Sequence, residues 1–199
     1  MTRRKDSFLD RSAGELLDLF AAGRNTPGAG SAAALIGALA GSLIQAVARY
    51  TLKAQGPMRE RAETLLKEAG ERYERLRAAV DEDAAAFDDF WKNRTDEALR
   101  RATDLPMAVA VDCLALAEMG IELYDQGFRN ARGEASAAAL SAVAGGEAAL
   151  HAARLNVGFA GAAGASSWAP ASRSEIGLLA GRLRVLREQI QSRIGGEPA

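Results

Sequence analysis

Carboxylate side chains are concentrated near the middle of the chain, at positions 81–83 and again at Asp88 and Asp89. In a helix, residues four apart share a face, so Asp83 would lie beside Phe87 on a largely apolar stripe. A carboxylate that is partly removed from water in this way can act as a general base or stabilise a cation. A solvated acidic helix face is the alternative interpretation of the same residues.

A glycine-rich turn at positions 26–31 (TPGAGS) precedes a long apolar segment. The N–H groups at the start of the following helix attract anions or carbonyl oxygens, and glycines let a ligand approach the backbone. The turn has no P-loop lysine and follows no strand, so nucleotide triphosphate binding is not expected. A plain turn that permits tight helix packing is the alternative.

Three further polar residues, Asn130, Glu134 and Asn156, flank the second alanine-rich segment. Amides near helix ends usually act as caps, which is the alternative to a binding role. The single histidine, His151, and the single cysteine, Cys113, form no zinc-ligand pattern. No metal site is therefore predicted.

The elements that must position these residues are predicted to be helices. The chain has 199 residues, 44 of them alanine and 20 glycine, and few are β-branched. The expected helices, in order, are 12–22, from the 26–31 turn to about 53, 58 to about 93 in one piece or broken near Gly70, a short segment from Thr95 or Asp96, a helix capped by Asp104 and running to 126, 134–158, and 172–194. Ser12 with Glu15 and Ser172 with Glu175 are expected to form capping boxes, and Gly23 is expected to end the first helix. A stripe of small residues is expected on the second helix at Gly30, Ala34, Gly37 and Gly41. We predict one all-α domain over residues 1–199, a compact bundle of six or seven helices with Ala/Gly-rich central helices.

Charge and composition also limit the partners. The net charge of −1 argues against a nucleic-acid binder. Residues 25–48 carry no charge and could span a bilayer by length, but they are mostly Ala, Gly and Ser, so a buried central helix is the preferred interpretation. A lone cysteine and the absence of an apolar run after Arg3, Arg4 and Lys5 lead us to expect a cytoplasmic protein without membrane contact.

The order of these features resembles the formimidoyltetrahydrofolate cyclodeaminase / methenyltetrahydrofolate cyclohydrolase family. The segments similar to that family's motifs are TPGAGSAAA at 26–34, VARYT at 47–51, DAAAFD at 83–88, a helix start at Pro106, GFRNARGE at 127–134 and LNV at 155–157. The sequence departs from the family pattern at Ala29, Arg49, Ala54, Gln55, Gly133, Glu134 and Ala160.

The resemblance implies a folate one-carbon enzyme with no cofactor beyond a tetrahydrofolate substrate. It would hydrolyse methenyltetrahydrofolate to formyltetrahydrofolate, or cyclise formimidoyltetrahydrofolate with loss of ammonia; a stand-alone domain favours the first. Asp83 is the implied acid/base and Glu134 replaces a family aspartate. The implied substrate-binding residues are Gly28, Gly30, Ser31, Asn130 and Asn156.

Two other functions remain open. The same fold could act on a different amidine-like or cyclic substrate, which the replaced family residues favour. A non-catalytic dimeric helical binding protein is the other alternative. The small-residue helices and the family's dimeric habit together predict a homodimer.

Overall fold

The computed structural model describes residues 7–162 and 166–196, and within them the chain is helical with no strand. The helices are η1 (Phe8–Asp10), α1 (Ala13–Ala21), α2 (Ala29–Lys53), α3 (Arg59–Asn93), α4 (Asp96–Gln126), η2 (Arg129–Ala131), α5 (Arg132–Ala162) and α6 (Ala169–Gly195). The predicted all-α bundle is confirmed, with six α-helices in the described residues.

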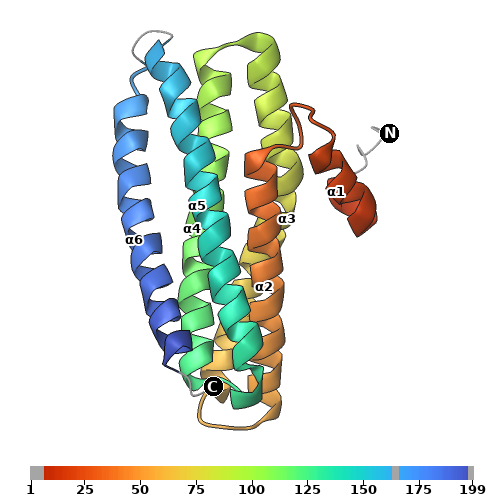
Figure 1. The fold of residues 1–199 in the computed structure, drawn as a ribbon, viewed down its shortest axis with the longest axis vertical. Coiled ribbons are helices and arrows are strands. Elements are labelled where there is room, and N and C mark those ends of the chain that lie inside the picture. The colour runs from red at the N-terminus through yellow and green to blue at the C-terminus, as the bar shows by residue number, and fades with distance from the viewer. Residues whose placement is uncertain (1–6, 163–165, 197–199) are drawn as a thin grey trace.

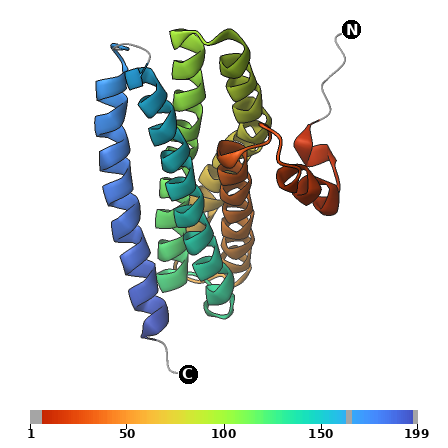
Figure 2. The same ribbon diagram turned by 45° about the horizontal axis from the view of Figure 1, so that its top comes forward.

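Five long helices, α2 to α6, run side by side along the length of the molecule (Figure 1). Helix α2 packs against α3, α4 and α5, while α6 covers the outer side of α4 and α5. The short α1 lies to one side of this bundle (Figure 2). Since α2 begins where α3 and α5 approach their C-terminal ends, residues from three distant parts of the sequence meet there.

Glycines bring the helix backbones of the core unusually close together. A Cβ added at Gly37 would lie 2.7 Å from the Cys113 Sγ, and one at Gly120 would lie 3.0 Å from the backbone nitrogen of Ala139. Both distances are shorter than packed carbon atoms allow. The predicted small-residue stripe on α2 therefore faces the interior, where Gly30, Ala34, Gly37 and Gly41 are all buried.

Two predicted signals at the ends of α1 are confirmed. The Ser12 hydroxyl accepts the N–H of Glu15 at 3.3 Å, and the Glu15 carboxylate accepts the N–H of Ser12 at 2.9 Å. These reciprocal bonds form a capping box. After the helix, Gly23 has a φ of +66°, a left-handed conformation that favours glycine.

Of the two alternatives for residues 58–93, the single uninterrupted helix is the one observed, with Gly70 inside α3. Two predicted boundaries were wrong. Ser172 is a buried residue inside α6 rather than its cap. Asp104 begins no helix, because α4 is continuous from Thr95, whose side chain caps it, and Pro106 lies in its interior. A proline normally breaks a helix by leaving the carbonyl four residues earlier without a donor. Here that carbonyl, on Ala102, accepts the Asn156 Nδ2 at 2.8 Å.

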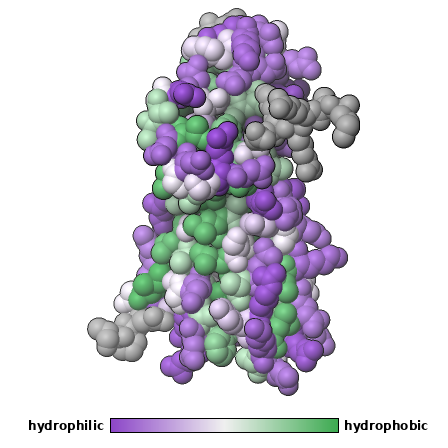
Figure 3. Space-filling model, turned by 90° about the vertical axis from the view of Figure 1, so that its right-hand side faces the viewer, coloured by the Kyte–Doolittle hydropathy of each residue, from purple (hydrophilic) through white to green (hydrophobic). Residues whose placement is uncertain are grey.

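Helix α2 is long and apolar enough to cross a membrane by length and composition alone. In this structure 12 of its 25 residues are buried against the other helices, as expected for a central core helix. Hydrophobic surface nevertheless runs lengthwise in an interrupted band on the side of the molecule shown in Figure 3.

The contact between α4 and α5 generates a prediction about stability. Gly120→Ala should lower the free energy of unfolding by about 1–3 kcal/mol, because the added methyl meets the Ala139 backbone, which cannot move aside. Gly177→Ala is the matched control, because Gly177 lies exposed inside α6 with no neighbour within 4 Å. That change should raise the unfolding free energy by about 0.5–1 kcal/mol. Urea denaturation measures both, and wild-type stability in Gly120→Ala would contradict the close contact.

Candidate active site

Asp83 of α3 lies directly against the first turn of α2. The buried Ser31 hydroxyl donates to the Asp83 Oδ2 at 3.0 Å. A Cβ at Gly30 would lie only 2.1 Å from the Asp83 Oδ1, so the carboxylate occupies the space of the missing side chain. The glycine at position 30 therefore leaves the space that the Asp83 carboxylate occupies.

Burial raises the pKa of Asp83, while the hydrogen bond from Ser31 lowers it by a smaller amount. Removing a carboxylate from water disfavours its charged form, which is the cause of the rise. A carboxyl group with a raised pKa exchanges protons more readily near neutral pH, as a general acid or base must.

The glycine turn forms one side of a cavity of about 320 Å³. Its wall contains Asn25, Thr26 and Gly28, and the Thr26 hydroxyl lies 3.4 Å from both carboxylate oxygens of Asp88. Gly28 occupies the N-cap position of α2 and provides no side-chain cap. Without such a cap, the first N–H groups of α2 need partners from outside the helix, and the Asp83 carboxylate is one for the N–H of Ser31.

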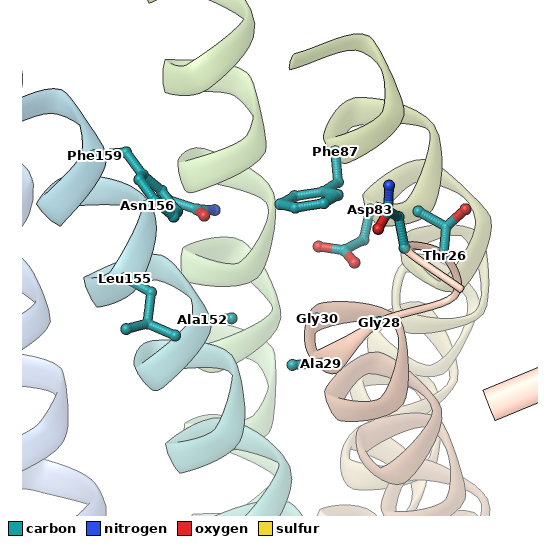
Figure 4. A pocket seen from close by; sticks show the side chains of 11 residues that line it. Thr26, Gly28, Ala29, Gly30, Asp83, Phe87, Ala152, Leu155, Asn156 and Phe159 are labelled. Carbon is teal, nitrogen blue, oxygen red and sulfur yellow. The ribbon is translucent and has the colours of Figure 1, made fainter. Parts of the chain in front are cut away.

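Helix α5 forms the opposite wall with Ala152, Leu155, Asn156 and Phe159 (Figure 4). The Asn156 Nδ2 donates a hydrogen bond to the Ala102 carbonyl. This is the carbonyl that Pro106 leaves without a donor from its own helix. In the described residues, the Asn156 amide has no other hydrogen bond. Its Oδ1 therefore remains available to accept an N–H from a ligand.

The cavity combines apolar walls with a few polar groups that converge on it. Phe87 and Phe159 face each other across it, and Asp83 lies beneath Phe87 (Figure 4). Its volume is at the lower end of the range for small-molecule sites. The arrangement suits a flat, largely apolar ligand that carries a positive or N–H-bearing group toward Asp83.

The structure places the predicted residues in two groups. Gly28, Gly30, Asp83 and Asn156 line the cavity, and Ser31 supports it through the Asp83 carboxylate. These five residues come from α2, α3 and α5, so their meeting is a consequence of the bundle.

Asn130 and Glu134 do not join that group within one chain. Both are exposed at the start of α5, and Glu134 lies 22 residues before Asn156 on the same helix. That separation is about 33 Å along the helix axis. Both residues therefore lie outside this cavity within one chain, a separation that sequence order does not reveal because it does not say which end of a long helix meets α2. Their roles in binding or catalysis stay predictions.

Sequence reasoning missed the α5 side of the cavity except for Asn156. Leu155 and Phe159 are 54% and 52% exposed, which is unusual for large apolar side chains on a helix otherwise rich in alanine. Their spacing of four residues around Asn156 is the signal that could have indicated a binding wall.

Other reactive groups lie away from the cavity. Burial raises the pKa of the Cys113 thiol to about 12, so it is no thiolate nucleophile at neutral pH. His151 is exposed on α5. Among residues 7–162 and 166–196, no three His, Cys, Asp or Glu side chains are grouped as metal ligands.

Comparison with known proteins gives a consistent result. The family model for formiminotransferase-cyclodeaminase matches residues 12–162. A methenyltetrahydrofolate cyclohydrolase from Methylorubrum extorquens is 32% identical over an alignment of 161 positions, which covers 71% of this chain and 74% of that protein.

A solved structure agrees at the level of the fold. The crystal structure of formiminotetrahydrofolate cyclodeaminase from Thermotoga maritima matches with a TM-score of 0.79 and 22% identity, covering 94% of this chain and 98% of that one. With the family model matching three quarters of its length, this chain belongs to the formiminotransferase-cyclodeaminase family.

Proposed function

We propose that this protein hydrolyses methenyltetrahydrofolate to formyltetrahydrofolate at the Asp83 cavity. The observation that carries the proposal is a desolvated carboxylate between apolar walls, opposite an amide oxygen. Methenyltetrahydrofolate holds its one-carbon unit as a cationic amidinium, which an adjacent carboxylate stabilises. The relative that is 32% identical bears the name of this activity.

The hydrolysis needs one acid/base group and no other reagent than water. Asp83 accepts a proton as the water oxygen bonds to the methenyl carbon, giving a neutral tetrahedral adduct. Asp83 then returns that proton to N5 as the carbon–N5 bond breaks, while the adduct hydroxyl releases its proton to solvent. The products are the formyl compound and one proton, so atoms and charge balance.

Ring closure of formimidoyltetrahydrofolate with loss of ammonia is the related reaction that this site also supports. It requires the same positioned acid/base, since a nitrogen attacks the one-carbon unit and ammonia leaves. The name of the Methylorubrum protein favours the hydrolysis for this chain.

The residues that depart from the family pattern support an intact reaction centre. Arg49, Ala54 and Gln55 end α2, and Glu134 lies in the first turn of α5, so these changes gather at the end of the bundle away from Asp83. Of the departures named above, only Ala29 lines the cavity.

The first test is turnover by the wild type and by Asp83→Asn. Loss of the methenyl absorbance should exceed the spontaneous rate in the wild type. The variant should be slower by roughly 10²–10⁴-fold, because an amide cannot accept the proton. Equal rates in the two proteins would remove Asp83 from the mechanism, and no turnover or folate binding by the wild type would favour a different substrate.

The control for this variant is its stability. The pKa of Asp83 is higher in the folded state than in the unfolded state, where it is about 3.9. The free energy of unfolding therefore falls as the pH rises from the unfolded-state pKa through the folded-state pKa, because Asp83 ionises over this range. At neutral pH, Asp83→Asn should therefore unfold at no lower urea concentration than the wild type. A lower midpoint would show that the lost activity reflects a damaged fold.

A second variant moves the carboxylate without removing it. The methyl of Gly30→Ala overlaps the Asp83 carboxylate, which can rotate away because it ends a flexible side chain. We expect turnover to fall roughly 10- to 100-fold, the cost of displacing a catalytic group by about 1 Å, with little change in melting temperature. In the double variant, Gly30→Ala should lower turnover only slightly below that of Asp83→Asn alone. If the two losses of turnover combine in full, Gly30→Ala does not act through the Asp83 carboxylate.

The protein's association state follows from a different surface. Leu39 of α2 is 55% exposed within a 24-residue uncharged segment, and Leu140 of the neighbouring α5 is 38% exposed. Uncharged apolar surface of this kind is typical of interfaces between identical subunits. A homodimer that covers the α2–α5 side of the bundle would bury it.

Light scattering on a size-exclusion column tests the dimer. We expect a mass near twice the 20.9 kDa of one chain for the wild type. Leu39→Glu should give the monomer, because a charge in an apolar interface is left unpaired. Leu178→Glu is the matched control, since Leu178 is 70% exposed on α6, away from α2. A wild-type monomer at micromolar concentration would overturn the proposal.

The remaining expectations concern location and other partners. A cytoplasmic protein that binds neither nucleic acid nor membranes is consistent with the near-zero net charge and with α2 packed inside the bundle. The proposed ligand is a tetrahydrofolate, without a further cofactor.

A further inference from the structure

One face of α3 carries a carboxylate, two aromatic rings and a cation in succession. Asp83, Phe87 and Trp91 are four residues apart in turn, so their side chains emerge from the same side of the helix. Arg94, the residue that ends the helix, lies over the Trp91 ring. From Asp83 to Arg94 the row extends for about 16 Å along the helix axis. Its first two members line the cavity, and the last two continue beyond it.

The two rings and the cation contact one another. The rings of Phe87 and Trp91 are stacked, with centroids 6.2 Å apart and planes inclined by 20°. The guanidinium carbon of Arg94 lies 3.8 Å from the Trp91 ring centroid. Trp91 remains 48% exposed, so this aromatic surface continues from the cavity into solvent.

Arg94 has features that its capping position does not require. Its φ is +55°, a left-handed conformation in which glycine or asparagine is favoured over a long side chain. Within the described residues its guanidinium pairs with no carboxylate, whereas Arg61, Arg182 and Arg193 all do. It is held by stacking on Trp91, with its N–H groups free to bind an anion.

The sequence of chemical groups on this face matches that of a substituted folate. The cationic one-carbon unit is attached to the nitrogen of an aminobenzoyl ring, and that ring is followed by glutamate with its carboxylates. We propose that Phe87 and Trp91 bind the aminobenzoyl ring and that Arg94 binds a glutamate carboxylate, an assignment that rests on the proposed function. Arg94 is then the residue that selects glutamate-bearing substrates.

The charges around the cavity agree with this assignment. Asp83 lines the cavity, and Asp88 lies 3.4 Å from the Thr26 hydroxyl in its wall, so both would repel a carboxylate there. A guanidinium at the far end of the row offers planar, paired N–H donors that match a carboxylate. The substrate is thereby oriented with its cation toward Asp83 and its anion toward Arg94.

The experiment compares two substrates in three proteins. The substrates are methenyltetrahydrofolate and methenyltetrahydropteroate, which lacks the glutamate. The proteins are the wild type, Arg94→Asn and Lys92→Asn. Asparagine tolerates the left-handed backbone at position 94. Lys92 is the matched control because it is also exposed and cationic, but it emerges from the other side of α3.

The wild type should show a KM for the glutamate-bearing substrate that is lower by roughly 10- to 100-fold, the size of one charged hydrogen-bonded contact. Arg94→Asn should lose this preference with kcat unchanged, and Lys92→Asn should keep it. A full preference in Arg94→Asn, or an equal loss in Lys92→Asn, would overturn the assignment while leaving the proposed reaction in place.

Calorimetry separates the two proposals if the wild type turns over neither substrate. The probe is p-aminobenzoylglutamate, with p-aminobenzoate as its truncated partner. Binding of the first to the wild type but not to Arg94→Asn supports the anion site even without the proposed reaction. Absent binding to the wild type, or equal binding to both proteins, overturns it.

Discussion

The close approach of α2 to its neighbours is the constraint on which the site depends. A Cβ at Gly145 would lie 3.1 Å from the Ala33 carbonyl oxygen, and one at Gly37 would reach the Cys113 sulfur. Larger side chains at these positions would push α2 away from α4 and α5. The first turn of α2 would move with it, and the contact between Gly30 and Asp83 would open. The glycines that hold the core together thus also set the position of the carboxylate relative to the cavity.

A second dependence joins α4 to the opposite wall of the cavity. Pro106 removes the N–H that would have bonded to the Ala102 carbonyl, and Asn156 supplies the missing donor from α5. An unsatisfied buried carbonyl is costly, so the proline and the asparagine stabilise each other's environment. The same bond uses the Nδ2 of Asn156 and fixes which way its amide points, with the Oδ1 left for a ligand. Asn156 is both a structural donor and a wall of the site, so its loss would disturb α4 as well as binding.

Local chemistry in the sequence was sufficient for much of the fold and for half of the site. The Ser12 capping box, the stop at Gly23 and the small-residue stripe each act through neighbouring residues, and each prediction was confirmed. Local signals were not sufficient where long-range contacts decide the outcome. Pro106 was expected in the first turn of a helix, because its rescue by Asn156, 50 residues later, leaves no local signal. Glu134 was grouped with Asp83 through the family resemblance, whereas α5 carries it to the other end of the bundle.

The aspartates of α3 differ in the partners that the fold brings to them. Asp81 accepts hydrogen bonds from Ser7 and from the N–H of Phe8, and so anchors η1 to the bundle. Asp88 lies near the Thr26 hydroxyl and helps to position the glycine turn. Asp83 interacts with both the hydroxyl and the backbone N–H of Ser31, and it is the one whose pKa burial raises. Asp81 and Asp88 hold N-terminal segments in place, whereas Asp83 faces a largely apolar cavity. The partners that the fold brings to each aspartate, rather than its place in the acidic run, separate the structural groups from the one suited to proton transfer.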